Sequence, residues 1–203
     1  MKHLRTLGLT AMAVLALTAI VDVSSASAKN FHSTNAGKIV SEIKNTHTFG
    51  LTGSTVNCNT IAFNGNANTN SETMVVHPEY SNCKAFGFLN TTVNTAGCNY
   101  RFNANLNTFD LEGCTGGGIN FGSSGCSVFY PNQTGINGVT YTNTNTAPNR
   151  TLDIKTASTN LKFNVTSANM FGCPLTEGGK HNNATYNGDT GVMVEGSAET
   201  WIE

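Results

Sequence analysis

The residues of this chain that are best suited to chemistry are its six cysteines, and their spacing decides what they can do. The gaps between them are 24, 14, 15, 11 and 46 residues. No C-x2-C pair is present, so neither a zinc site nor a thioredoxin-like redox centre is predicted. An even number of cysteines in an exported chain instead predicts disulfides, formed by Cys58, Cys83, Cys98, Cys114, Cys126 and Cys173.

Six cysteines can pair in 15 ways, and the sequence alone does not select one of them. We expect Cys58–Cys83, because each of these residues lies in or beside an early predicted strand. The other two pairs are then Cys114–Cys126, which closes a Gly-rich loop, and Cys98–Cys173. Disulfide loops of this size contribute roughly 3 kcal/mol each to stability in the chain-entropy model.

No other residue pattern predicts a catalytic, metal or cofactor site. The histidines after residue 28 form no H-x-H or H-E-x-x-H motif, and we expect surface or edge positions for His32, His47, His77 and His181. Asp110 and Glu112 share one face of a predicted strand, where they are expected to be solvated. The glycine-rich stretches 113–118 and 122–125 match no phosphate-binding motif and predict flexible or bulged loops.

Residues 1–28 have the layout of a secretory signal peptide. Lys2 and Arg5 precede an apolar run from Leu7 to Val21, and Ala-Ser-Ala at 26–28 provides small residues for cleavage. A membrane anchor would need about 20 predominantly apolar residues, whereas this run ends after 15 at Asp22. We therefore expect an exported mature protein, residues 29–203, with no membrane span after cleavage.

The composition is polar but almost uncharged. Asn, Thr, Ser and Gly together supply 92 of the 203 residues, while charged residues make up 11% and the net charge is −1. Electrostatic capture of nucleic acid is not expected of such a chain. Apolar residues at 38%, with a charge near zero, also argue against intrinsic disorder.

The body of the chain alternates apolar and polar residues with a period of two, which indicates half-buried antiparallel strands. The clearest hairpin runs from Tyr100 to Leu111 and places Phe102 opposite Phe109. Short strands separated by Gly and Asn turns predict one disulfide-stapled all-β domain over 29–203. We favour an antiparallel β-sandwich; a β-barrel or two small stacked sheets are the alternatives.

Further predicted elements cover the remainder of the mature chain. Strands are expected near 38–44, 54–63, 72–79, 86–94, 126–131, 139–142, 152–155, 161–165, 183–187 and 191–197. Turns are expected at Asn64-Gly65, Asn137-Gly138, Ala147-Pro148-Asn149 and Asn187-Gly188-Asp189.

Four stretches, at 80–88, 97–102, 125–128 and 133–142, resemble an uncharacterised group of exported all-β proteins from high-GC Gram-positive soil bacteria. The likeness covers most of residues 50–200. It implies a shared disulfide-bearing β fold, and it brings no catalytic or ligand-binding residues with it.

Two classes of function follow from these patterns. The first is a secreted, non-catalytic domain, extracellular or associated with the cell wall, that is structural or contacts a glycan, a partner or a second copy of itself. Its outward Thr and Asn side chains offer neutral hydrogen bonds that suit sugar hydroxyls. The alternative is a secreted hydrolase whose site is assembled from distant residues, which no local motif supports.

Phe129 is the residue we single out for ligand or partner contact. In the stretch from Cys126 to Pro131, residues of one parity share a face. If Cys126 points inward, then Val128 and Tyr130 enter the core and Phe129 points outward. We expect neighbouring Gly-rich loops to cover its ring; if the ring is exposed, it is a platform for a sugar or a partner.

Overall fold

The computed structural model describes residues 28–168, 173, 175 and 178–203, and these form seventeen β-strands and no helix. The predicted signal segment therefore lies, apart from Ala28, outside the described residues. No helix in the described part of the chain has the length and apolar character needed to cross a membrane. The all-β class predicted from the alternation is confirmed.

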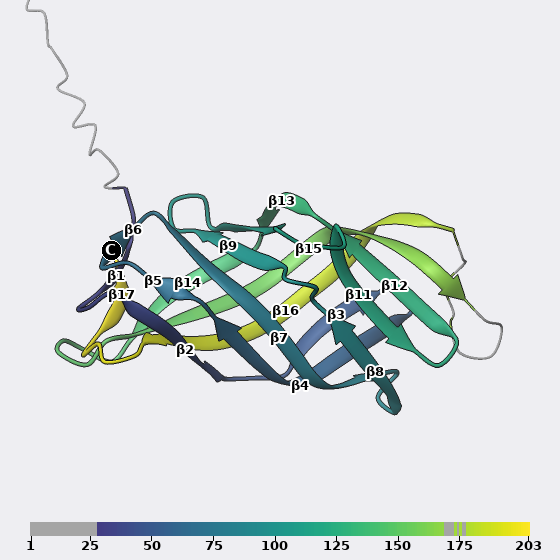
Figure 1. Cartoon of the computed structure of the whole chain (residues 1–203), viewed down its shortest axis with the longest axis horizontal. Helices are drawn as coiled ribbons and strands as arrows, with labels where there is room; N and C mark the ends of the chain where they lie inside the picture. The colour runs from purple at the N-terminus through teal and green to yellow at the C-terminus, as the bar shows by residue number, and fades with distance from the viewer. Residues whose placement is uncertain (1–27, 169–172, 174, 176–177) are drawn as a thin grey trace, which may run out of the picture.

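Eight of these strands close into an antiparallel barrel (Figure 1). They pair in the order β7-β4-β3-β16-β15-β12-β11-β8, and β8 returns to pair with β7. Their bounds are β3 His47–Leu51, β4 Ser54–Asn64, β7 Thr73–Ala85, β8 Leu89–Asn94, β11 Gly118–Ser123, β12 Cys126–Pro131, β15 Thr151–Ala168 and β16 Lys180–Val194. Of the predicted architectures, the structure has the barrel rather than the favoured sandwich.

The longer barrel strands continue past the closed ring and pair with additional strands. β9 (Asn99–Asn103), β10 (Thr108–Glu112) and β13 (Gln133–Asn137) extend the sheet from β7, and β14 (Val139–Thr144) pairs with β15. β2 (Gly37–Ile43) pairs with β16 and with the short β5 (Asn66–Ala67). The result is the elongated shape seen in Figure 1.

The two ends of the described chain meet in a separate three-stranded sheet, β17-β1-β6. Its strands are β1 (Phe31–Ser33), β6 (Asn70–Ser71) and β17 (Thr200–Ile202). Asn30 and Glu203 exchange two backbone hydrogen bonds, of 2.6 and 3.1 Å. This sheet closes the end of the molecule from which the chain begins (Figure 1).

Two pairs of predicted strands are in fact single long strands. The segments 152–155 and 161–165 both belong to β15, which continues through a bulge between Ser158 and Leu161. Asn160 takes a positive φ of 61° there. The segments 183–187 and 191–197 are joined in β16 through Gly188, so the turn predicted at 187–189 is wrong.

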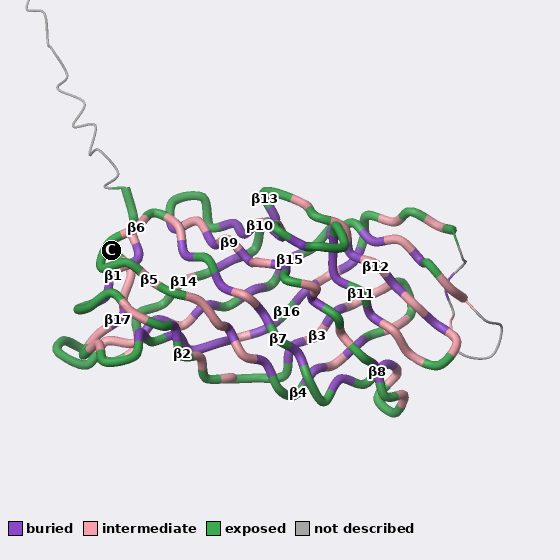
Figure 2. Tube along the Cα trace, in the orientation of Figure 1, coloured by how far each residue is buried: buried purple, intermediate pink, exposed green. Residues whose placement is uncertain are grey.

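The strand faces follow the predicted alternation: buried residues alternate with more exposed ones along the strands (Figure 2). The buried side chains form one hydrophobic core. In the hairpin β9–β10, Phe102 pairs with Phe109 as predicted, and both rings are fully buried. An eight-stranded barrel has an interior just wide enough for side chains to fill. Here the filling is mostly aromatic, with ring centroids of Phe49, Tyr100 and Tyr186 4.7–6.0 Å apart where they touch.

All six cysteines form disulfides, but only one pair was predicted correctly. Cys58–Cys83 joins directly paired residues of β4 and β7. The predicted pairs Cys114–Cys126 and Cys98–Cys173 are wrong: the structure has Cys98–Cys114 and Cys126–Cys173. The register of β9 against β10 brings the first of these pairs together, because Asn99 lies opposite Glu112.

The connectivity can be checked by mass spectrometry. Proteolysis without reduction should yield three disulfide-linked peptide pairs, 58–83, 98–114 and 126–173, and intact mass should rise by two hydrogens per bridge on reduction. A peptide that links Cys114 to Cys126, or a free thiol in the unreduced protein, would contradict this arrangement.

Candidate functional site

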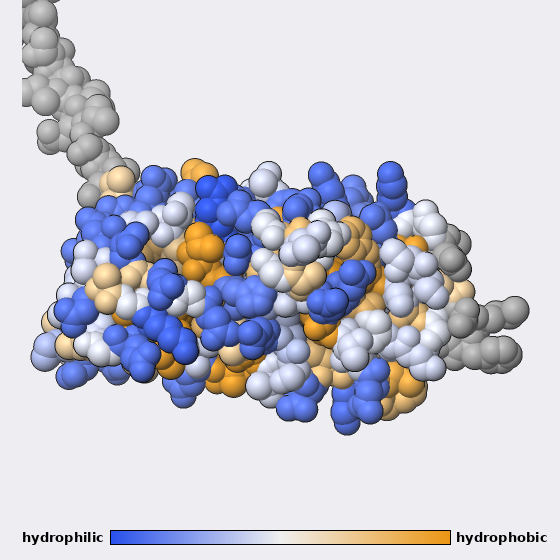
Figure 3. Space-filling view, viewed as in Figure 1, coloured by the Kyte–Doolittle hydropathy of each residue, from blue (hydrophilic) through white to orange (hydrophobic). Residues whose placement is uncertain are grey.

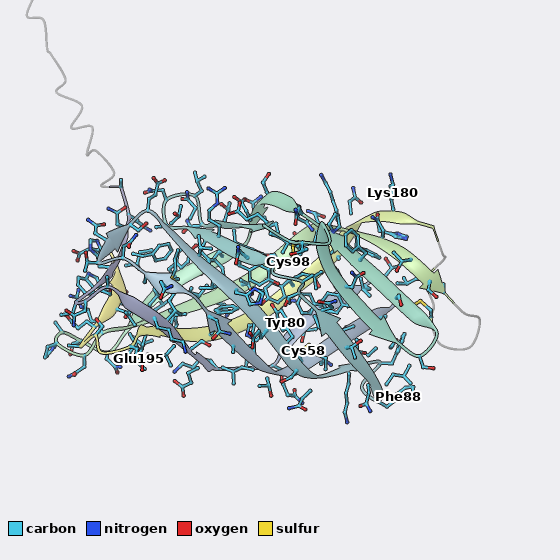
Figure 4. The ribbon with its side chains drawn as sticks, in the orientation of Figure 1. Cys58, Tyr80, Phe88, Cys98, Lys180 and Glu195 are labelled. Atoms are coloured by element: carbon cyan, nitrogen blue, oxygen red, sulfur yellow. A yellow bond between two sulfur atoms is a disulfide. The ribbon has the colours of Figure 1, made fainter. Side chains whose placement is uncertain are left out.

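A chain of hydrogen-bonded polar side chains crosses the barrel interior. The Tyr80 hydroxyl lies 2.9 Å from that of Tyr100 and 2.8 Å from that of Tyr186. Tyr186 lies 2.8 Å from Nδ1 of His47, and Nε2 of His47 lies 3.0 Å from the hydroxyl of Thr190. Strands β3, β7, β9 and β16 contribute these residues, and Tyr80 lies in the middle of the molecule (Figure 4). We call this set the tyrosine–histidine chain.

His47 is therefore a core residue, with 1% of its surface exposed, and its predicted surface or edge position is wrong. Its alternation with Phe49 turns both side chains inward on β3. Burial lowers the pKa of His47 to about 4, because the charged imidazolium loses its hydration. Burial likewise raises the pKa of the Tyr80 and Tyr186 hydroxyls well above the ordinary value.

Each link of the tyrosine–histidine chain can be satisfied when all five groups are neutral. A neutral imidazole has one donor and one acceptor nitrogen, and each hydroxyl donates one proton. The protons can therefore all point along the chain in one direction, so that no donor faces another donor. This arrangement removes the penalty of about 1–3 kcal/mol that each unpaired buried hydroxyl would carry.

Gly188 makes room for His47. A Cβ atom at Gly188 would overlap the imidazole ring, at Nδ1 and Cε1. The carbonyl of Gly188 also accepts a hydrogen bond of 3.3 Å from the Thr156 hydroxyl. The glycine that suggested a turn in the sequence is thus needed for close packing inside a strand.

The barrel interior offers no space for a substrate in its described part. Two internal cavities have volumes of about 10 and 20 Å³. A site of this size holds roughly one water molecule. The first cavity is bordered by Tyr100, Tyr130 and Tyr186, and the Tyr130 hydroxyl has no hydrogen-bond partner among the described residues. The tyrosine–histidine chain links β3, β7, β9 and β16 through side-chain hydrogen bonds.

The carboxylates singled out in the sequence are neutralised by an arginine. Arg101 Nη2 lies 2.6 Å from Asp110, and its Nε lies 3.2 Å from Glu112. Asp110 also accepts a 2.6 Å hydrogen bond from the backbone N–H of Gly135, which holds β13 against β10. These two carboxylates are therefore engaged in structural contacts.

A second carboxylate pair, which sequence reasoning missed, lies on the outer face of β15 and β16. Asp153 pairs with Gly191, and Asp189 lies two residues away on the same face. Burial raises the pKa of Asp153, an effect that Lys44 opposes and Asp189 reinforces. Lys44 occupies the hollow over Gly191, where an added Cβ atom would lie 2.8 Å from its Cε. The lysine side chain thus covers the space between the two carboxylates.

Metal binding has no support among the described residues. No group of three or more His, Cys, Asp and Glu side chains is placed there to hold an ion.

The Gly-rich stretch 113–118 forms a turn fixed by the Cys98–Cys114 disulfide and by a 2.8 Å hydrogen bond from the Thr115 backbone N–H to the Ala96 carbonyl.

Phe129 lies at the centre of an outward row that crosses five strands. Directly paired residues of neighbouring strands share a face. Successive pairs give the row Asn94 (β8), Asn120 (β11), Phe129 (β12), Asn164 (β15) and Lys180 (β16). Val128 and Tyr130 are buried as predicted, and the outward direction of Phe129 follows from the same alternation. We call this set the Phe129 row.

The Phe129 ring is half-buried rather than fully covered. Its tip rests against Gly118, where an added Cβ atom would lie 2.7 Å from Cζ. The residues paired directly with Phe129 on the neighbouring strands are both polar, Asn120 on one side and Asn164 on the other. The row therefore combines one aromatic surface with flanking amides. On the face drawn in Figure 3, hydrophilic and neutral residues surround several smaller apolar patches.

Two other aromatic residues compete for a contact role, and the sequence had not indicated either. Trp201 stacks on His32 with ring centroids 5.2 Å apart, and the Arg150 guanidinium lies 4.1 Å from the Trp201 ring. The Trp201 indole is therefore already in contact with His32 and Arg150. Phe88 is 71% exposed at the β7–β8 hairpin tip (Figure 4), with no paired polar row beside it.

Comparison with known proteins does not assign this chain to a family. No family model, no curated protein and no solved structure matches it.

The burial of His47 predicts a loss of stability in mild acid. The unfolded chain takes up a proton near pH 6.5, whereas the folded protein does so near pH 4. Stability is therefore complete above the unfolded pKa and falls by about 3 kcal/mol as the pH drops from 6.5 to 4. Urea unfolding at a series of pH values across this range should show this decrease in the free energy of unfolding. The decrease should disappear in His47→Gln and persist in His32→Gln. A wild-type stability that is flat between pH 6.5 and 4 would contradict the burial of a neutral His47.

The contact between Gly188 and His47 predicts that Gly188→Ala is destabilising. A methyl group there overlaps the imidazole, and overpacking of this kind costs about 1–3 kcal/mol or more. Gly116→Ala is the matched control, because a Cβ atom at Gly116 has no neighbour within 4 Å. Equal unfolding midpoints for the two variants would show that the ring does not occupy this position.

Proposed function

We propose that this protein is exported and acts outside the cytoplasm as a non-catalytic β-barrel that contacts a glycan of the cell wall or the surrounding medium through the Phe129 row. Three disulfides support an oxidising environment. The signal-like segment 1–28 supports export. The filled interior supports a function on the outer surface.

The observation that carries this proposal is the pairing of Phe129 with Asn120 and Asn164. A half-buried phenylalanine offers a rigid apolar surface to the face of a sugar ring, at a low cost in side-chain entropy. The amides on both sides can donate to and accept from sugar hydroxyls. Because the strands of a closed barrel hold all three residues, the surface is preorganised.

A secreted hydrolase is the second candidate, favoured by one observation. Burial raises the pKa of Asp153, which lies near a second carboxylate, Asp189, and glycoside hydrolysis uses two carboxyl groups, one of them an acid of raised pKa. Lys44 lies against Gly191 beside Asp153, and its positive charge opposes the rise in the pKa of Asp153. We therefore place binding ahead of hydrolysis.

The test is retention on insoluble glycans by wild type, Phe129→Ala and the control Phe88→Ala. Peptidoglycan, cellulose, chitin and insoluble pectate serve as probes. We expect Phe129→Ala to lose at least tenfold in retention on the glycan that wild type binds, with stability lowered by only about 1–2 kcal/mol, because the ring is partly exposed. Phe88→Ala should behave as wild type.

Three outcomes contradict the proposal. If retention survives Phe129→Ala, Phe129 is not the residue that contacts the glycan. A stability loss of about 3–5 kcal/mol, which is typical of a fully buried phenylalanine, would lead to the same conclusion. Release of reducing ends by wild type, abolished in Asp153→Asn, would establish the hydrolase instead.

A further inference from the structure

An outer groove adjoins the Phe129 row at its β15–β16 end. It has a volume of about 490 Å³ and is lined by Pro131, Lys162, Asn164, Lys180, His181 and Asn182. Asn164 and Lys180 are themselves members of the row, and Pro131 lies two residues beyond Phe129 on the same face of β12. The groove and the Phe129 row thus form one continuous surface.

Among the described residues, the groove carries positive charge and no carboxylate. Lys162 and Lys180 are both exposed, and neither forms an ion pair with a described residue. Arg101 and Arg150 are, by contrast, paired with carboxylates. The whole chain has only 11 Lys and Arg residues and a net charge of −1. Two lysines in one groove, with no ion pair to a described residue, therefore make the groove more positive than the chain as a whole.

The two lysines are arranged to meet one extended ligand. Asn164 lies directly opposite Lys180 across β15 and β16, and Lys162 is two residues from Asn164 on the same outer face. The lysines consequently occupy diagonal positions of neighbouring strands, with the Asn164 amide between them. Figure 4 shows Lys180 at the edge of the molecule with its side chain directed outward.

We propose that this groove binds an acidic polysaccharide built from uronic acid units. One sugar ring packs against Phe129, hydroxyls bond to Asn164, and ring carboxylates lie on the ammonium groups of Lys162 and Lys180. A uronan is favoured over a polyol phosphate because Phe129 requires a ring face, which an open-chain polyol does not provide. This inference rests on the proposed glycan contact and specifies its ligand class.

The experiment measures binding of galacturonic acid oligosaccharides to the full protein by calorimetry. The comparison ligands are the same oligosaccharides with reduced carboxyl groups, a polyol phosphate polymer and dextran sulfate. We expect wild type to bind the galacturonate form at least tenfold more tightly than the reduced form, with an affinity that falls as salt rises. The double variant Lys162→Gln/Lys180→Gln should bind both forms equally weakly, whereas the matched control Lys38→Gln/Lys84→Gln should retain the preference.

The outcomes separate this inference from the proposed function. Equal binding of both oligosaccharides by wild type, unchanged in the double variant but lost in Phe129→Ala, overturns the acidic ligand and leaves the glycan contact standing. Dextran sulfate or the polyol phosphate binding as tightly as galacturonate overturns it as well, because charge alone would then suffice. Absence of binding to every glycan overturns both.

Discussion

The barrel depends on one constraint: aromatic rings fill its interior, and the hydroxyls of three of them, Tyr80, Tyr100 and Tyr186, are held there in one hydrogen-bonded chain. Tyr80 and Tyr186 are too deeply buried to reach water, so Tyr100 and His47 complete their hydrogen bonds, and Thr190 pairs with the second nitrogen of His47. A buried polar network of this kind stabilises only when every member is satisfied. It links β3, β7, β9 and β16. It also requires a glycine at position 188, because any side chain there would overlap the His47 ring.

That filled interior directs the functional question to the outer surface. The outer faces carry mainly neutral Asn, Thr and Ser side chains, which solubilise the sheet without generating a strong electrostatic field. Against this background, a half-buried ring in a row of amides, next to two lysines that form no ion pair with a described residue, is a distinct chemical feature. The disulfides and the terminal sheet hold the ends of the strands, so ligand contact need not order the surface first.

Much of this arrangement follows from alternation. The faces of β9, β10 and β12 were predicted correctly, including the outward direction of Phe129, because each strand has one buried side. The pairing of Cys98 with Cys114 was also accessible: the predicted Phe102–Phe109 pair, continued outward along the hairpin, brings these two cysteines together. The same alternation applied to Phe49 would have placed His47 inside.

Other features depend on contacts between distant strands and could not be read locally. A sandwich and a barrel show the same alternation, and only the return pairing of β8 with β7 and β11 closes the ring. Gly188 has the sequence signature of a turn, but its lack of a side chain serves His47, which is far away in the chain. The groove combines β12, β15 and β16, whose lysines are unremarkable in the sequence.

Nuclear magnetic resonance titration with galacturonic acid oligosaccharides is the most direct test of the proposed ligand binding at the Phe129 row of a filled barrel. We predict chemical-shift changes confined to Asn120, Phe129, Asn164, Lys180 and their immediate neighbours, with the Tyr80 ring signals unchanged. Shifts centred on the interior tyrosines, or on the Phe88 hairpin at the edge of the barrel, would contradict it.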